Sequence, residues 1–108
     1  MHPPAAYINE IANFFMLVVF RGGLEDNVVS ESETVRLGDL SGQTVRDLIV
    51  HIEKHLLKNS YKHFATGGEL EGGILCVVNE TDLDILEGGD TPLRETDTVH
   101  FISTMHGG

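Results

Sequence analysis

The chain has 108 residues, a length that suits one domain with a single hydrophobic core. Its formal net charge is −10, from 17 Asp and Glu against seven Lys and Arg. This balance argues against direct binding of nucleic acid or of anionic membranes, since both attract Lys and Arg. It favours partners with basic surfaces, although a role in solubility alone is the simpler explanation of the charge.

The single cysteine, Cys76, excludes an intramolecular disulfide and favours a reducing compartment. No stretch of sequence approaches the roughly 18 apolar residues of a membrane span. Residues 1–13 contain no Lys or Arg, unlike secretory or mitochondrial leaders. We therefore expect a cytoplasmic protein, with the nucleus as a second compartment, and treat residues 1–13 as an N-terminal extension.

The first predicted elements are two strands joined as a hairpin. Residues 14–20 are all apolar, which is typical of a buried strand. The break at Arg21-Gly22-Gly23 and the polar cluster at 25–27 indicate a turn. Residues 28–37 mix Val, Thr and Leu with polar side chains, which favours a second, half-solvated strand.

A helix is predicted next. Thr44 and Asp47 have the spacing of a capping box, in which the two side chains satisfy free N–H groups of the first turn. Apolar residues then recur at helical spacing on one face: Val45, Leu48, Ile49, Ile52 and Leu56. The helix should end near residues 58–60.

The remaining elements are shorter. Residues 61–73 read as a loop, 74–78 as an apolar strand in the centre of the sheet, and 79–89 as turns with a short strand or one helical turn. Cys76 lies in this apolar strand and is expected to be a small buried hydrophobe, not a nucleophile. Residues 98–104 form the last strand, with Val99 and Phe101 on one face and His100 and Ile102 on the other.

This order predicts an α+β fold of the ubiquitin-like β-grasp type. It would have a mixed sheet of four to five strands and one main helix across one face. The domain spans residues 14–104. Residues 105–108, hereafter the tail, are expected to be flexible.

The tail ends in Gly107-Gly108. Glycine has no Cβ, so such a tail can thread into a narrow channel of another protein and present the carboxylate of Gly108. A carboxylate is a poor electrophile and needs activation, for example as an acyl-adenylate made by an ATP-using partner. The chain contains five Gly-Gly pairs, so a terminal pair alone is weak evidence.

The sequence offers no self-contained active site. His51 and His55 are four residues apart, a spacing that can bind zinc, but His-Ile-Glu-Lys-His lacks the Glu position of the metalloprotease motif. Two surface histidines are the preferred interpretation, so we predict no metal site. Arg21-Gly22-Gly23 is better read as a hairpin turn than as an RNA-binding tripeptide.

Residues 101–108 read Phe-Ile-Ser-Thr-Met-His-Gly-Gly and resemble the end of the eukaryotic ubiquitin-related modifier family, Ile-Ser-Thr-Leu-His-Gly-Gly. Only Met105 departs, standing where that family has Leu. Further similarity occurs at 19–25, at 44–52 and at 73–82, so it covers roughly residues 16–108. Gly72 and Leu83 differ from the Pro and Trp usual in the family.

The resemblance implies a protein carrier and no enzyme. An adenylyltransferase/sulfurtransferase would adenylate Gly108 and convert it to a thiocarboxylate, using ATP and a sulfur donor, with no cofactor bound to the carrier itself. A tRNA thiolase complex would place the sulfur on wobble uridine. The carrier would also be conjugated to lysines of target proteins.

The resemblance also implies that Gly107 and His106 belong to the threaded tail. We expect Ile102 and Met105 to form an apolar partner contact beside it, with burial in the core as the alternative. We expect a monomer. Two other functions stay open: a sulfur carrier for molybdopterin or thiamine synthesis, and a ubiquitin-like interaction module without tail chemistry.

Overall fold

The structure, a computed structural model, describes residues 15–59 and 61–104. The main elements are four longer strands and the helix that crosses them: β1 (Phe15–Arg21), β2 (Ser32–Arg36), α2 (Val45–His55), β5 (Ile74–Val78) and β7 (Thr98–Ser103). Short elements lie between them: η1 (Leu24–Asn27), η2 (Leu37–Asp39), β3 (Ala65–Thr66), β4 (Glu69–Leu70), β6 (Thr81–Asp82), η3 (Leu83–Ile85) and η4 (Gly88–Asp90).

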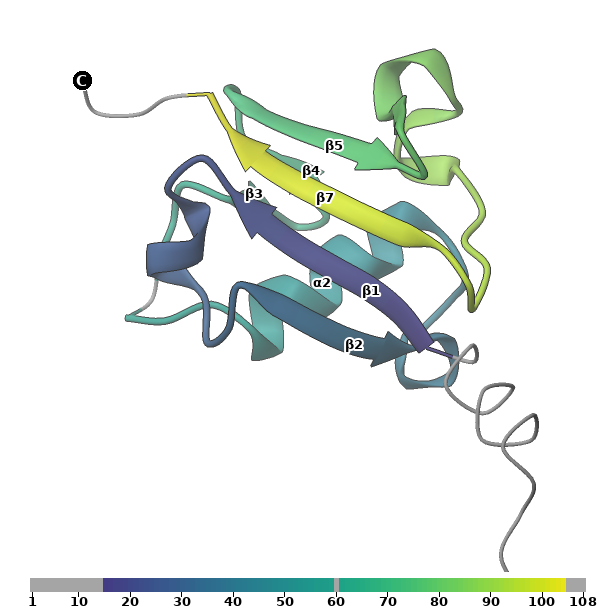
Figure 1. Cartoon of the computed structure of the whole chain (residues 1–108), viewed down its shortest axis with the longest axis horizontal. Helices are drawn as coiled ribbons and strands as arrows, with labels where there is room; N and C mark the ends of the chain where they lie inside the picture. The colour runs from purple at the N-terminus through teal and green to yellow at the C-terminus, as the bar shows by residue number, and fades with distance from the viewer. Residues whose placement is uncertain (1–14, 60, 105–108) are drawn as a thin grey trace, which may run out of the picture.

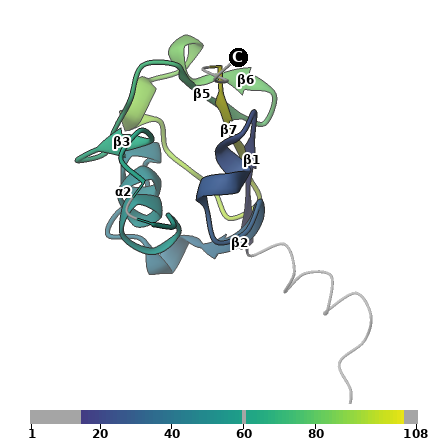
Figure 2. The same ribbon diagram turned by 90° about the vertical axis from the view of Figure 1, so that its left-hand side faces the viewer.

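The main sheet has five strands in the order β2-β1-β7-β5-β6. β1 pairs antiparallel with β2 and parallel with β7, while β5 pairs antiparallel with β7. Figure 1 shows α2 crossing behind this sheet, and Figure 2 shows the sheet and α2 as two layers. The predicted mixed sheet, hairpin and α+β fold of the β-grasp type are therefore confirmed.

The helix begins where the sequence predicts it, but it ends at His55 and not near residues 58–60, because the chain leaves the helix at Leu56 and Leu57 bridges to Val28. The Thr44 hydroxyl accepts a hydrogen bond from the Asp47 N–H, and the Asp47 carboxylate accepts one from the Thr44 N–H at 3.1 Å. These bonds satisfy donors that the first helical turn leaves free. All five apolar residues of the predicted face are buried: Val45, Leu48, Ile49, Ile52 and Leu56.

The core lies between α2 and the sheet, and three phenylalanines meet in it. Phe101 of β7 stacks against Phe20 of β1 with ring centroids 5.9 Å apart. Phe64, which precedes β3, packs edge-on against Phe101 with ring centroids 5.3 Å apart. All three side chains are at most 1% exposed. Phe101 thus joins the middle strand to the segment that follows the helix.

Two predictions about the strands were wrong. The central strand is β7 and not β5, because β7 lies between β1 and β5. The second strand begins at Ser32, not at Val28, because Val28 is buried and bridges to Leu57 after the helix.

The predicted loop at 61–73 contains a small antiparallel hairpin of β3 and β4. Glu53 of α2 accepts hydrogen bonds from the N–H groups of Gly67 and Gly68 at its turn, at 3.1 and 2.7 Å. A side chain of the helix therefore holds the hairpin in place.

The expected N-terminal extension and tail lie outside the described residues, so these boundaries stay predictions. Within residues 15–59 and 61–104, the structure contains no helix with the length and apolar character needed to span a bilayer.

Candidate functional site: the root of the C-terminal tail

β7, the strand that precedes the tail in the sequence, lies in the middle of the sheet. The end of β7 lies beside the start of β5 and the end of β1 (Figure 1). Ser103 pairs with Ile74 of β5, and Ile102 pairs with Arg21 of β1. We call Ser103, Thr104 and the glycines that contact them, Gly22 and Gly73, the tail root.

Thr104 is held on the β5 side of the root. Its N–H donates to the carbonyl oxygen of Gly73 at 2.7 Å, and its hydroxyl donates to the same oxygen at 2.8 Å. Gly73 has φ of +89°, a left-handed conformation that suits glycine. The last described residue before the tail is therefore bonded twice to one point.

Gly22 closes the root on the β1 side. Its φ is +71°, and a Cβ at this position would overlap the carbonyl oxygen of Ser103 and lie 3.0 Å from its nitrogen. Only glycine permits this approach of two backbones. Ser103 itself is 9% exposed, so the end of β7 is enclosed from both sides.

Ile102 lies on the face of the sheet opposite α2. It is half-buried, between Arg21 of β1 and Leu75 of β5 in the sheet register. Leu75 is 39% exposed, so apolar surface continues sideways from Ile102. The alternative of core burial is therefore wrong for Ile102, while its contact with a partner stays a prediction.

The other predicted site residues lie outside the described part of the chain. These are Met105, His106, Gly107 and Gly108. The roles assigned to them stay predictions. The structure adds the residues that hold the strand before them, Thr104, Gly73 and Gly22. The Gly-Gly pairs at 22–23 and 72–73 were visible in the sequence, but nothing there indicated that they meet beside the last strand.

Cys76 is buried in the core at 2% exposed, as predicted. Burial, and to a smaller extent the nearby Asp82 carboxylate, raise the pKa of its thiol to about 12. The thiolate is the reactive form of cysteine, so this side chain is unsuited to carry sulfur or an acyl group.

We therefore expect Cys76 of the folded protein to resist a thiol reagent such as dithiobis-nitrobenzoate at pH 8. Its rate should be at least ~1,000-fold below that of a free cysteine, since a pKa raised by several units removes nearly all thiolate. The absorbance of released thionitrobenzoate measures the rate. The same protein in guanidinium is the control and should react fully. Fast reaction of the folded protein would contradict the inert buried thiol.

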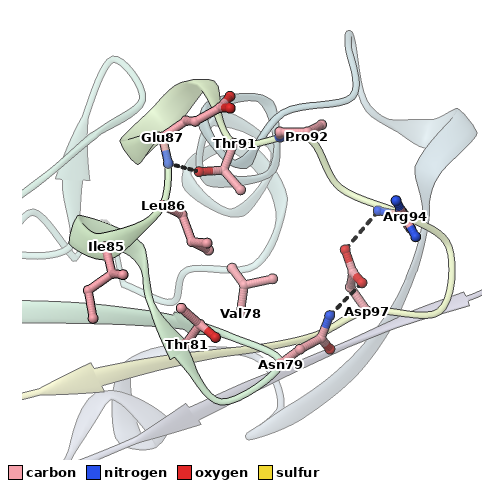
Figure 3. A pocket seen from close by; sticks show the side chains of 10 residues that line it. All are labelled: Val78, Asn79, Thr81, Ile85, Leu86, Glu87, Thr91, Pro92, Arg94 and Asp97. Carbon is pink, nitrogen blue, oxygen red and sulfur yellow. Dashed lines mark hydrogen bonds between the residues drawn. The ribbon is translucent and has the colours of Figure 1, made fainter.

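A cavity with a volume of about 580 Å³ lies at the end of β7 opposite the tail root. Figure 3 shows Leu86 and Val78 pointing toward each other across it. Asp97 accepts hydrogen bonds from the Asn79 amide and the Arg94 N–H, at 2.7 and 2.8 Å. These polar groups stabilise the loops of the cavity, which gives them a structural role.

His51 and His55 lie side by side on α2 with ring centroids 4.9 Å apart. Partial burial and the neighbouring His55 lower the pKa of His51, while Asp39 opposes this shift. Within the described residues, no group of three His, Cys, Asp or Glu side chains could hold a metal ion. The prediction of no metal site is open to measurement as zinc content.

Comparison with known proteins places this arrangement in a family. The family described as Urm1 (Ubiquitin related modifier) matches residues 16–108. Ubiquitin-related modifier 1 of Bos taurus is 39% identical over 94 residues, covering 84% of this chain and 92% of that protein. The Homo sapiens protein of the same name is 36% identical with the same coverage.

A solved structure agrees with these relatives. The solution structure of Urm1 from Trypanosoma brucei has 32% sequence identity and a TM-score of 0.71, covering 88% of this chain and 96% of that one. The sequence comparison and the structure comparison therefore indicate the same family over most of the chain. The chain belongs to the ubiquitin-related modifier family, and it is a ubiquitin-like modifier and sulfur carrier, a carrier protein and not a catalyst.

Proposed function

We propose that the carboxylate of Gly108 is the working group of this protein. A partner adenylyltransferase/sulfurtransferase activates it with ATP and converts it to a thiocarboxylate. The sulfur then passes, through a separate tRNA thiolase complex, to the 2-position of wobble uridine. The observation that carries this proposal is the match of the family through residue 108, which includes Gly107-Gly108.

The proposed reaction has three steps: adenylation, sulfur transfer and release of the thiocarboxylate. A carboxylate oxygen of Gly108 attacks the α-phosphorus of ATP, pyrophosphate leaves, and an acyl-adenylate forms. The terminal sulfur of a persulfide on the partner then attacks the acyl carbon, and AMP leaves. A thiol of the partner cleaves the resulting S–S bond, is itself oxidised to a disulfide, and releases the thiocarboxylate.

The carrier presents the Gly108 carboxylate to its partner and supplies no reacting side chain. Its one thiol is buried with a pKa of about 12, and ATP and the sulfur donor are bound by the partner. The tail root holds the strand that precedes the reacting group, in line with the requirement that reacting atoms be well positioned. The net charge of −10 suits partners with basic surfaces, and the tRNA is contacted by those partners.

A second use of the same group is conjugation. The ε-amine of a target lysine attacks the acyl-adenylate, AMP leaves, and an isopeptide bond joins Gly108 to the target. The name of the family as a ubiquitin-related modifier favours this branch. We propose that the protein acts as a monomer in the cytoplasm, with the nucleus as a second compartment.

Intact mass spectrometry tests the proposal. The full chain is incubated with ATP, the cognate activating enzyme and a persulfide donor, and its mass is compared with that of a sample lacking ATP. We expect the replacement of one oxygen by sulfur at the C-terminus, located by fragmentation of the terminal peptide. No change with an enzyme that is active on another carrier would leave a non-covalent interaction module as the better account.

A further inference from the structure

We propose that Thr104 is a positioning residue that fixes the tail root, so that only the four residues 105–108 provide the reach of the Gly108 carboxylate. The effect of Thr104 on activation of Gly108 rests on the proposed function. The structural part of the inference, a strand end held at Thr104, can be measured without any partner.

The first support is the pair of hydrogen bonds from Thr104 to Gly73. Peeling β7 from its end would break both bonds before it released any further residue. A net gain of about 1 kcal/mol for a typical hydrogen bond makes the peeled state roughly tenfold or more rarer than without the two bonds. The hydroxyl of Thr104 is exposed at this point, so it contributes to the strand end and not to the core.

The second support is the approach of Gly22 to Ser103 from the other side. The backbone of Gly22 packs against Ser103, and Ser103 pairs with Ile74 of β5. Release of Ser103 would therefore undo contacts with two neighbouring strands. The root is held from both sides, as expected for a fixed point from which a tail begins.

The consequence is a limit on distance. Four extended residues span at most about 13–14 Å, so the reaction centre of the activating partner must lie within this distance of the tail root. Peeling of Thr104 and Ser103 would add about 7 Å to the reach. Thr104 thus sets the maximum distance between the folded domain and the reacting carboxylate.

The test combines a shortened tail with a weakened root. Deletion of Met105 shortens the tail by one residue, and T104V removes the hydroxyl bond while keeping the side-chain shape. The two changes are made singly and together in the full chain. ATP–pyrophosphate exchange with the activating enzyme gives kcat and KM for each protein. Met105→Gly is the control for the lost side chain, and T104S retains the hydroxyl.

We expect the deletion to lower kcat/KM roughly 100-fold or more, because the carboxylate falls short of its position by about 3.5 Å. Met105→Gly should lose much less. In the T104V background, deletion of Met105 should lower kcat/KM by a factor roughly fivefold smaller than in the wild type. The weakened strand end can detach residue 104 from the sheet, which restores the lost length. With T104S the cost should equal that in the wild type.

Equal deletion costs in the wild-type and T104V backgrounds would overturn the inference, as would full activity of the shortened chain. Amide hydrogen exchange tests the anchor at Thr104 in the isolated protein, without the activating enzyme. The Thr104 amide should exchange slowly in the wild type and in T104S, and several-fold faster in T104V. Exchange at the rate of an unstructured peptide in the wild type would refute the anchor itself. If the wild-type chain instead showed no ATP–pyrophosphate exchange with the activating enzyme, the proposed function would be refuted.

Discussion

Deleting Gly108 is expected to lower ATP-dependent activation of the chain by more than about 100-fold. The deletion moves the terminal carboxylate back by one residue, about 3.5 Å, and even a displacement of about 1 Å costs roughly 100-fold in positioned chemistry. The residue that becomes terminal, Gly107, is chemically the same, so the loss would report position alone. ATP–pyrophosphate exchange with the activating enzyme measures it, and intact mass shows whether any thiocarboxylate forms.

Gly38→Ala is a matched control for the loss of one glycine. A Cβ at Gly38 would meet no atom within 4 Å, and this residue lies in η2, away from the tail root. Its activation should equal that of the wild type. The folded state of both variants is checked through the protection of Cys76. A fully active chain without Gly108 would contradict the assignment of the reacting group.

Replacing Phe101 by alanine is expected to remove about 3–5 kcal/mol of the free energy of unfolding. Phe101 is fully buried, stacks on Phe20 and packs edge-on against Phe64, so truncation leaves a cavity where three segments meet. Domains of this size are stable by about 5–15 kcal/mol in total, so much of the stability would be lost. Urea denaturation followed by circular dichroism measures the change.

Two further variants make this result specific. Phe101→Leu keeps most of the apolar volume and should cost clearly less than the alanine variant. Ile85→Ala alters a side chain that is 77% exposed and should stay within about 0.5 kcal/mol of the wild type. A cost below about 1 kcal/mol for Phe101→Ala would show that the contacts of Phe101 with Phe20 and Phe64 contribute little to stability.

The helix could be predicted because its signals are local. The Thr44–Asp47 capping box and the apolar face both lie within residues 44–56, and each contact joins residues that are at most about one turn apart. Burial of Cys76 was equally accessible, since a cysteine inside a short apolar run needs no knowledge of distant partners.

The order of the strands could not be predicted in the same way. β1 pairs in parallel with β7, and this contact joins the two ends of the described chain. Apolar runs indicate burial but do not specify a neighbour, so β5 was wrongly expected in the centre. The same limit applies to Val28, whose bridge to Leu57 depends on the path taken after the helix.

The hairpin of β3 and β4 was missed for another reason. Each of its strands has only two residues, too few for any periodic pattern. Its turn is held by the Glu53 carboxylate on α2, a contact that the local sequence does not reveal. The chemistry assigned to Gly107-Gly108 stays a prediction, whereas the residues that hold the tail root could be identified only from the assembled sheet.

The central position of β7 has a consequence for how the protein is made. Synthesis runs from the N-terminus, so β1, β2 and α2 leave the ribosome before their sheet has a middle strand. The two halves of the sheet can close only after residue 103 has been added, and such distant pairings form slowly. A chain that terminates early therefore lacks both the fold and the reacting end, and it is open to proteases.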